Sequence, residues 1–163
     1  MSGAHIVLDV DFTPNRTFVQ IEGTALRMPA ADFSDMVDTN AQMRKMMLRY
    51  VHTCAIQLSH SAIANGRYSV HERLARWLLM CHDRLDGDDV PLTHEFLSLM
   101  LGVRRSSVTN EIHVMEGRHL IKATRAHIKI LDRDRLREIA GGAYGVAERE
   151  YARLIGPHGR HVN

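Results

Sequence analysis

The spacing of apolar residues changes along the chain, and over residues 5–28 it follows the period of two that is typical of β-strands. Apolar and acidic side chains alternate at first, a Pro-Asn turn signal follows within residues 13–16, and a second apolar run begins at Phe18. We expect about two or three short strands here. So small a sheet is marginal alone and should need a partner surface or belong to a larger sheet. The apolar residues are Ile6, Leu8, Val10, Phe12, Phe18, Val19 and Ile21.

A long helix is predicted next, from about residue 38 or 39 to residue 64, with Asn65-Gly66 as its C-terminal stop. Apolar residues recur in it at alternating four- and three-residue steps, the pattern of two helices packed along their length. A dimerisation helix is the better interpretation, and the alternative is a helix buried within its own domain. The interface candidates are Met47, Val51, Cys54 and Leu58.

A second helix is predicted to begin after Ser69. Ser69 and Glu72 have the S-x-x-E spacing of a capping box, in which both side chains accept hydrogen bonds from unpaired amides at a helix start. Apolar residues then recur at helical spacing up to Cys81, and the turn-rich residues 86–89 end the pattern. Trp77 lies on the apolar face, so we expect it in the core.

Two short helices joined by a tight turn follow. Thr93 is a good N-cap for the first, and Gly102 stands where a left-handed residue would end it. The second starts near Arg105 and turns apolar residues inward at i, i+4 and i+7. This is a helix-turn-helix, whose second helix fits the major groove of DNA. The inward residues are Val108, Ile112 and Met115, and the outward candidates for base reading are Arg105, Ser106, Thr109 and Asn110.

The candidates suit base recognition, because Arg105 can donate two parallel hydrogen bonds to guanine and Asn110 can pair with adenine. Either side chain could also be simply solvated, since an isolated helix pair can be a plain packing unit. The next segment favours DNA binding. Residues 120–124 and 127–131 are β-prone and flank Arg125-Ala126, which predicts a hairpin, or β-wing. A tight turn prefers Gly at the position of Ala126, so either the turn is longer or its backbone is strained.

Positive charge is concentrated in the helix-turn-helix and the expected wing. The net charge of the whole chain is only +2, but residues 91–137 hold nine Lys or Arg against five Asp or Glu. Such a local excess is the electrostatic footprint of a nucleic-acid-binding surface. The expected wing contributes Lys122, Arg125, His127 and Lys129.

The order of these parts resembles the cyclic-AMP receptor protein/FNR family of bacterial transcription regulators. The resemblance runs from about Phe18 to the end of the wing and is most specific over residues 101–109, L-G-V-R-R-S-S-V-T. It implies an α+β fold with an N-terminal remnant of a cyclic-nucleotide-binding-type β-barrel (1–32) and a long central dimerisation helix (33–66). A C-terminal winged helix-turn-helix (67–140) and a C-terminal helix or tail (141–163) follow. The implied partners are double-stranded DNA with a two-fold symmetric operator, a second copy of the chain, and RNA polymerase.

The resemblance also implies roles for single residues. Arg105 falls on the guanine-reading Arg of the family, and Thr93 on a Thr that contacts phosphate. Ser106 and Asn110 replace a Glu and an Arg of the best-known member, so its operator should not be assumed here. Arg104 replaces a capping Ser, which removes about 1 kcal/mol of capping and adds a phosphate-seeking charge. The expected phosphate-binding residues are Thr93, Arg104, Ser107, Lys122 and Arg125.

Of the family's sensor β-barrel, only the last strands are recognisable in this sequence. Glu22-Gly23 reverses the Gly-Glu order of cyclic-nucleotide binders, no Arg stands in a matching context, and the four cysteines of an iron–sulfur member are absent. We therefore expect no response to cyclic nucleotides or oxygen, with DNA affinity set by dimerisation and salt. The alternative is a translation start further upstream that adds a full sensor.

Composition and the remaining motifs argue against other classes of protein. Two distant cysteines, Cys54 and Cys81, predict no disulfide framework, metal site or cofactor, and with no apolar run near 18 residues they favour a cytoplasmic protein. Eleven histidines could serve an enzyme, but no nucleophile elbow, phosphate loop or HExxH motif accompanies them. His158 and His161 are expected to be solvated. The remaining alternative is an interaction protein that does not bind DNA and pairs with a full-length homologue through the long helix.

Overall fold

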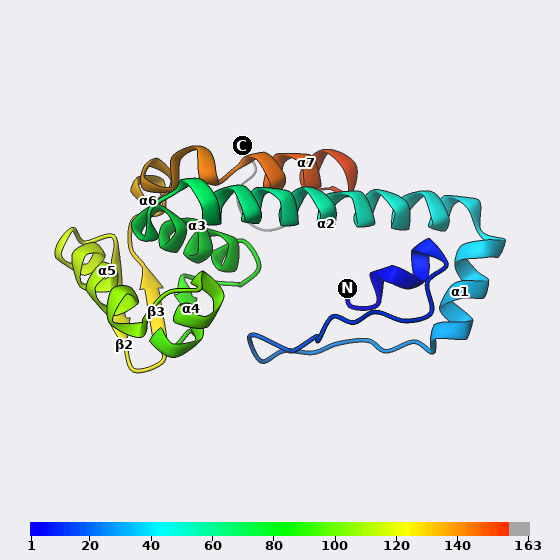
Figure 1. Ribbon diagram of the computed structural model, residues 1–163, viewed down its shortest axis with the longest axis horizontal. Coiled ribbons are helices and arrows are strands. Elements are labelled where there is room, and N and C mark those ends of the chain that lie inside the picture. The colour runs from blue at the N-terminus through cyan, green and yellow to red at the C-terminus, as the bar shows by residue number, and fades with distance from the viewer. Residues whose placement is uncertain (157–163) are drawn as a thin grey trace.

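The longest element is the helix α2 (Ala41–Arg67), which spans most of the length of the molecule (Figure 1). The computed structural model describes residues 1–156. Helix α1 (Ala30–Thr39) precedes α2 and lies across its N-terminal end. Asn40 separates the two helices, because its backbone is extended and its side chain accepts hydrogen bonds from the amides of Gln42 and Met43, at 3.1 and 3.0 Å.

The strands expected within residues 1–32 are wrong. Among the described residues no strand precedes residue 89; the segment instead forms the 3₁₀-helix η1 (Ala4–Leu8), an irregular stretch, and the start of α1, with Pro29 as its N-cap. A strand needs a neighbour to receive its backbone hydrogen bonds, and the described residues place none beside this segment. Local hydrogen bonds form in η1 instead, which packs on α1 and α2 and buries Val7.

The predicted long helix is confirmed, with shifted ends. The predicted start at residue 38 or 39 falls in α1, before the break at Asn40. At the other end α2 continues through Gly66, and the amide of Tyr68 still donates to the carbonyl of Ala64, at 3.1 Å. The Asn65-Gly66 stop therefore does not operate, because Gly66 keeps a negative φ and does not adopt the left-handed backbone of a terminating residue.

Four helices and a small sheet enclose the core of the second half of the chain. The helices are α3 (Val70–His82), α4 (His94–Leu101), α5 (Arg105–Gly117) and α6 (Arg133–Ala140). The predicted capping box of α3 is present: Glu72 accepts from the amide of Ser69 at 2.7 Å, and its own amide donates to the Ser69 hydroxyl at 3.3 Å. Trp77 is half-buried against the core, as expected. The largest fully buried side chains include Leu74, Leu78, Leu79, Leu97, Ile112, Met115, Leu120, Ile121, Ile128 and Leu136.

The sheet is antiparallel and has the strand order β1-β3-β2. Its strands are β1 (Asp89–Val90), β2 (Ile121–Thr124) and β3 (His127–Ile130), so the hairpin predicted around Arg125-Ala126 is present. Thr124 pairs with His127, which makes the connection a two-residue turn. With its helices and this sheet the chain is α+β, as predicted.

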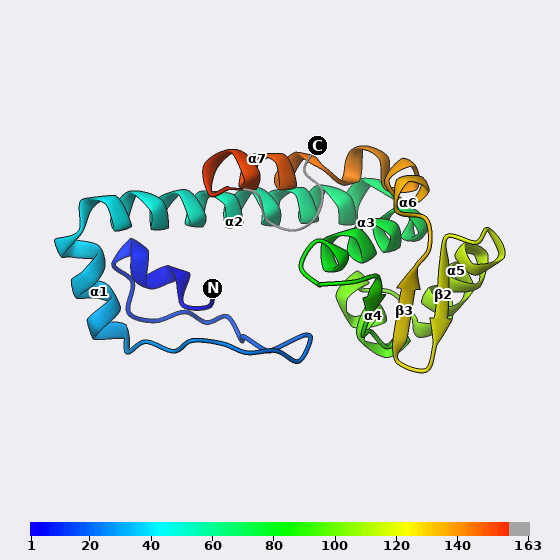
Figure 2. The same ribbon diagram turned by 180° about the vertical axis from the view of Figure 1, so that it is seen from behind.

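The chain then returns to the long helix. The 3₁₀-helix η2 (Gly141–Ala143) and the helix α7 (Val146–Leu154) follow α6, and α7 lies alongside α2 (Figure 2). Sequence patterns predicted a helix or tail here but not its packing partner. His158 and His161 lie outside the described residues. Within residues 1–156, every helix is too short or too polar to serve as a membrane span.

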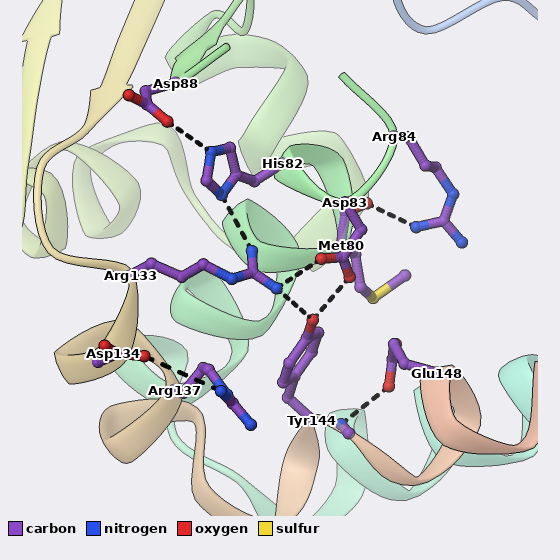
Figure 3. A network of polar contacts seen from close by, with 11 residues as sticks. Met80, His82, Asp83, Arg84, Asp88, Arg133, Asp134, Arg137, Tyr144 and Glu148 are labelled. Carbon is purple, nitrogen blue, oxygen red and sulfur yellow. Dashed lines mark hydrogen bonds and ion pairs between the residues drawn. The ribbon is translucent and has the colours of Figure 1, made fainter. Parts of the chain in front are cut away.

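A polar network joins the end of α3 to α6 and to the start of the returning segment (Figure 3). Arg133 donates to Asp83 at 2.6 Å and to the Tyr144 hydroxyl at 2.9 Å, and Tyr144 donates to the second carboxylate oxygen of Asp83 at 2.6 Å. Arg133 also donates to Nδ1 of the buried His82, whose Nε2 lies 3.0 Å from Asp88. Burial and the hydrogen bond to Asp83 raise the pKa of Tyr144 well above its usual value, so the phenol keeps its proton.

This network predicts a non-additive pair of substitutions. Arg133→Met should lower the free energy of unfolding by about 3 kcal/mol, because it leaves the carboxylate of Asp83 largely buried without its cation. Adding Asp83→Asn to that variant should restore part of the loss, since no unpaired charge remains. Urea denaturation of the two single variants and the double variant measures the coupling. Strictly additive effects would contradict this account.

Candidate nucleic-acid interface

The turn between α4 and α5 is built as its sequence predicts. The Thr93 hydroxyl accepts from the amide of Phe96 at 3.1 Å and caps α4. Gly102 ends α4 with a φ of 62°, a left-handed conformation that favours glycine. Only Gly102, Val103 and Arg104 separate the two helices. The predicted helix-turn-helix is therefore present, with α5 in the position of the recognition helix.

The two sides of α5 differ sharply. Val108, Ile112 and Met115 are fully buried in the core, as predicted. Arg105, Ser106 and Asn110 are exposed on the outer side. Three of the four predicted base-reading residues thus lie on one accessible face with hydrogen-bonding groups directed away from the core.

The fourth candidate, Thr109, is placed differently. It is half-buried, and its hydroxyl lies 3.0 Å from Nδ1 of His94 on α4. Burial lowers the pKa of His94 below its usual value, and the positive charge of Arg105 and the neighbouring His113 lower it further. The hydroxyl of Thr109 therefore already has a partner within the helix-turn-helix, which the outward position of this residue on the helical pattern did not reveal.

The N-terminus of α5 is open. Arg104 occupies the N-cap position and makes no capping hydrogen bond through its side chain. Arg104 and Arg105 are exposed there, and the half-buried Ser107 lies within the first turn. Uncapped amides, the positive end of the helix dipole and two guanidinium groups together form an arrangement that attracts anions.

The β2–β3 hairpin lies beside α5 and is tied to it, because the amide of Ala123 donates to the Glu116 carboxylate at 2.8 Å. Lys122 and Lys129 are directly opposite each other across the two strands, and both are exposed. Like charges in that position destabilise a sheet, and Asp89 of β1, opposite Lys129 on its other side, offsets part of the repulsion. Ala126 has a φ of 64°, which answers the question left by the sequence: the turn is tight and its backbone is strained. Arg125 is exposed at the tip.

Two contacts that hold the helix-turn-helix against α3 were not predicted. Nδ1 of His71 lies 2.7 Å from the Glu111 carboxylate on α5, and Arg73 donates to the carbonyl of Leu101 at the end of α4. His71 lies within the capping box of α3, and Arg73 follows it directly. Their polar character gave no signal of a partner far along the chain.

The predicted interface residues of α2 share one side of the helix but are not equally accessible. Leu58 is 71% exposed, whereas Met47, Val51 and Cys54 are half-buried. Both η1 and α7 also pack on α2. Beside this side of the helix lie exposed residues that the predicted pattern did not include: Leu48, Ala55 and Ala62.

Comparison with known proteins agrees with this architecture. Residues 72–139 match the family model of the Crp-like helix-turn-helix domain, which supports the resemblance noted in the sequence. A CRP-family transcriptional regulator from Thermus thermophilus superimposes with a TM-score of 0.55 at 21% identity, covering 61% of this chain and 54% of that one. A crp/fnr-family regulator from Eubacterium rectale gives 0.53 at 22% identity, covering 69% and 52%. The chain thus spans about half the length of these structures. No curated protein sequence matches it.

The environment of His94 predicts a pH effect on stability. Because its pKa is lowered in the folded state, the unfolded chain binds a proton more readily, and stability should fall as the pH drops below about 6.5. In the His94→Gln variant the side chain cannot take up a proton but can still form a hydrogen bond with the hydroxyl of Thr109. We expect the wild-type chain to lose stability relative to this variant between pH 7.5 and pH 5.5, measured by urea denaturation. A difference between the two proteins that does not change with pH would refute the assignment.

Proposed function

We propose that this chain is a sequence-specific DNA-binding transcription regulator that acts as a homodimer and has no catalytic activity. The single observation that carries the proposal is the two-sided construction of α5. Its inner side is fully buried, and its outer side presents Arg105, Ser106 and Asn110 beside a basic hairpin. The match of residues 72–139 to the Crp-like helix-turn-helix domain supports the same function.

In this proposal the start of α5 reads bases in the major groove. Arg105 donates two parallel hydrogen bonds to a guanine, and Asn110 lies about one turn beyond Ser106 on the exposed side, where its amide can pair with adenine. Ser106 lies at the very start of the helix and completes the exposed set. Thr109 contributes less directly, because its hydroxyl is bonded to His94.

The phosphate contacts come from both sides of α5. Thr93 and Arg104 lie at the N-termini of α4 and α5, where backbone amides and guanidinium groups favour an anion. Ser107 lies within the first turn of α5. Lys122 and Arg125 reach the backbone from the β2–β3 hairpin, which then acts as the wing. Contacts of this kind position the protein but carry no sequence information.

The proposed dimer forms along α2. An apolar stripe of large and small residues remains accessible on that helix, and a two-fold axis along it would direct two copies of α5 to major grooves about one helical turn apart. The interface residues are Met47, Val51, Cys54 and Leu58, with Leu48, Ala55 and Ala62 beside them. RNA polymerase would be a further partner of such a regulator on DNA.

We further propose that cyclic nucleotides are not its effectors. Glu22-Gly23 has the reverse of the Gly-Glu order that holds a cyclic nucleotide, and it lies in an irregular, exposed part of the chain. A ligand that binds no state preferentially cannot shift an equilibrium between states.

Base reading is tested by comparing two substitutions. An operator is first selected from a random duplex library with the pure protein. Arg105→Ala should then weaken operator binding by about 1 to 3 kcal/mol and relax the preference at one base pair in each half-site. Lys122→Ala, the matched control, should weaken operator and random DNA alike and flatten the salt dependence. Equal losses on both DNAs for Arg105→Ala would refute its role, and no selectable duplex at all would refute the function.

Dimerisation is tested by sedimentation at micromolar concentration. Val51→Asp should produce monomers, because a carboxylate on the stripe would be buried without a partner. Ile63→Asp is the control, since Ile63 is also an exposed apolar residue of α2 but faces another side of the helix. A wild-type chain that is already monomeric, or a Val51→Asp variant that still dimerises, would contradict the proposed interface.

A further inference from the structure

An open groove of about 490 Å³ lies between the N-terminal half of α2 and the C-terminal end of α7. It is remote from the helix-turn-helix, because α5 lies beyond the other end of the long helix (Figure 1). Leu48 and Leu154 are its large apolar side chains, and the described residues that line it include no acidic one. The basic lining residues are Arg44, Lys45, Arg49, His52 and Arg153.

Two acidic residues beside the groove neutralise part of this charge. Asp38 lies 3.7 Å from Arg44, and Glu150 lies 2.6 Å from Arg153. Nε2 of His52 also lies 3.7 Å from Glu150. Within the described residues, the four Lys and Arg side chains of the groove pair with these two carboxylates alone, so the groove keeps a net positive charge.

Lys45 and Arg49 carry the excess charge. In the part of the chain that the structure describes, the two side chains form no hydrogen bond or ion pair, and both are exposed. With His52 they lie at i, i+4 and i+7, so the three residues share one side of α2. The stripe around Val51 that is proposed for dimerisation lies on the opposite side, and Leu48 lies between the two. The basic side of the groove therefore stays accessible in the proposed dimer.

We propose that this groove binds an acidic amphipathic helix of a partner protein. Two helices packed side by side leave a groove that the apolar face of a third helix can fill. Leu48 and Leu154 contact the apolar side chains of the partner helix, and Lys45 and Arg49 meet its carboxylates. Exposed ion pairs contribute little affinity each, so burial of the leucines supplies the affinity and the charges select an acidic partner. A DNA backbone would use the cations but would leave the leucines without an apolar partner.

The binding measurement uses the full chain without DNA, so its result is independent of the proposed function. The probe is a fluorescein-labelled synthetic helix of about five turns, with leucines along one side and glutamates on the others. Fluorescence anisotropy should show saturable binding. Two matched peptides, one with Gln for every Glu and one with Ala for every Leu, should each bind at least about tenfold more weakly. This comparison uses the wild-type protein, so it does not depend on whether any variant folds.

Lys45→Glu combined with Arg49→Glu locates the site. The double variant should bind the probe at least about tenfold more weakly, because both cations are replaced by like charges of the peptide. Its melting temperature should stay close to that of wild type, since the two side chains are exposed and unpaired within residues 1–156. Lys122→Glu combined with Arg125→Glu makes the same change of charge on the β2–β3 hairpin and should leave probe binding unchanged.

Four outcomes would overturn the proposal. They are absent saturation at roughly 1 mM protein, equal binding of the three peptides, equal losses in the two double variants, and displacement of the probe by a random DNA duplex. The last result would assign the groove to nucleic acid instead of a protein partner.

Discussion

A buried arginine determines how the long helix sits on the helix-turn-helix domain. Arg76 of α3 is only 4% exposed, and it donates to the hydroxyl of Ser61 on α2 at 3.1 Å and to the carbonyl of Ala143 in η2 at 2.9 Å. A guanidinium group is buried only where its hydrogen bonds are satisfied, so these elements must meet at this point. The direction of α2 relative to α5 therefore depends on that contact.

The parts of the fold that could be predicted are those specified by neighbouring residues. Ser69 and Glu72 satisfy amides in their own helix turn, Thr93 caps the helix it precedes, and Gly102 provides the left-handed residue that ends α4. Each of these signals needs no information from elsewhere in the chain. They suffice to place a helix-turn-helix and its outward-facing Arg105, and the hairpin follows from two short β-prone runs.

The predictions that failed concern features that depend on contacts between distant segments of the chain. Period-two alternation before residue 29 resembled strands, but a strand exists only where another strand pairs with it, and here η1 packs on α2 instead. The position of Thr109 on its helix was correct, whereas its hydrogen bond to His94 requires the packing angle of α4 on α5. Helix α7 has an amphipathic pattern, with Ala147, Tyr151 and Leu154 at i, i+4 and i+7, but that pattern does not tell that α2 covers its apolar side.

The two opposed lysines of the β2–β3 hairpin couple the stability of the sheet to the binding of an anion. Lys122 and Lys129 face each other across β2 and β3, and Asp89 of β1 is opposite Lys129 on its other side, so the part of the repulsion that Asp89 does not offset opposes strand pairing in the free protein. A polyanion lying across the hairpin would remove this repulsion and tighten the ladder that carries it. The hairpin should therefore be more protected from amide hydrogen exchange when a polyanion is bound than when the protein is alone. Anion binding and strand pairing there stabilise each other.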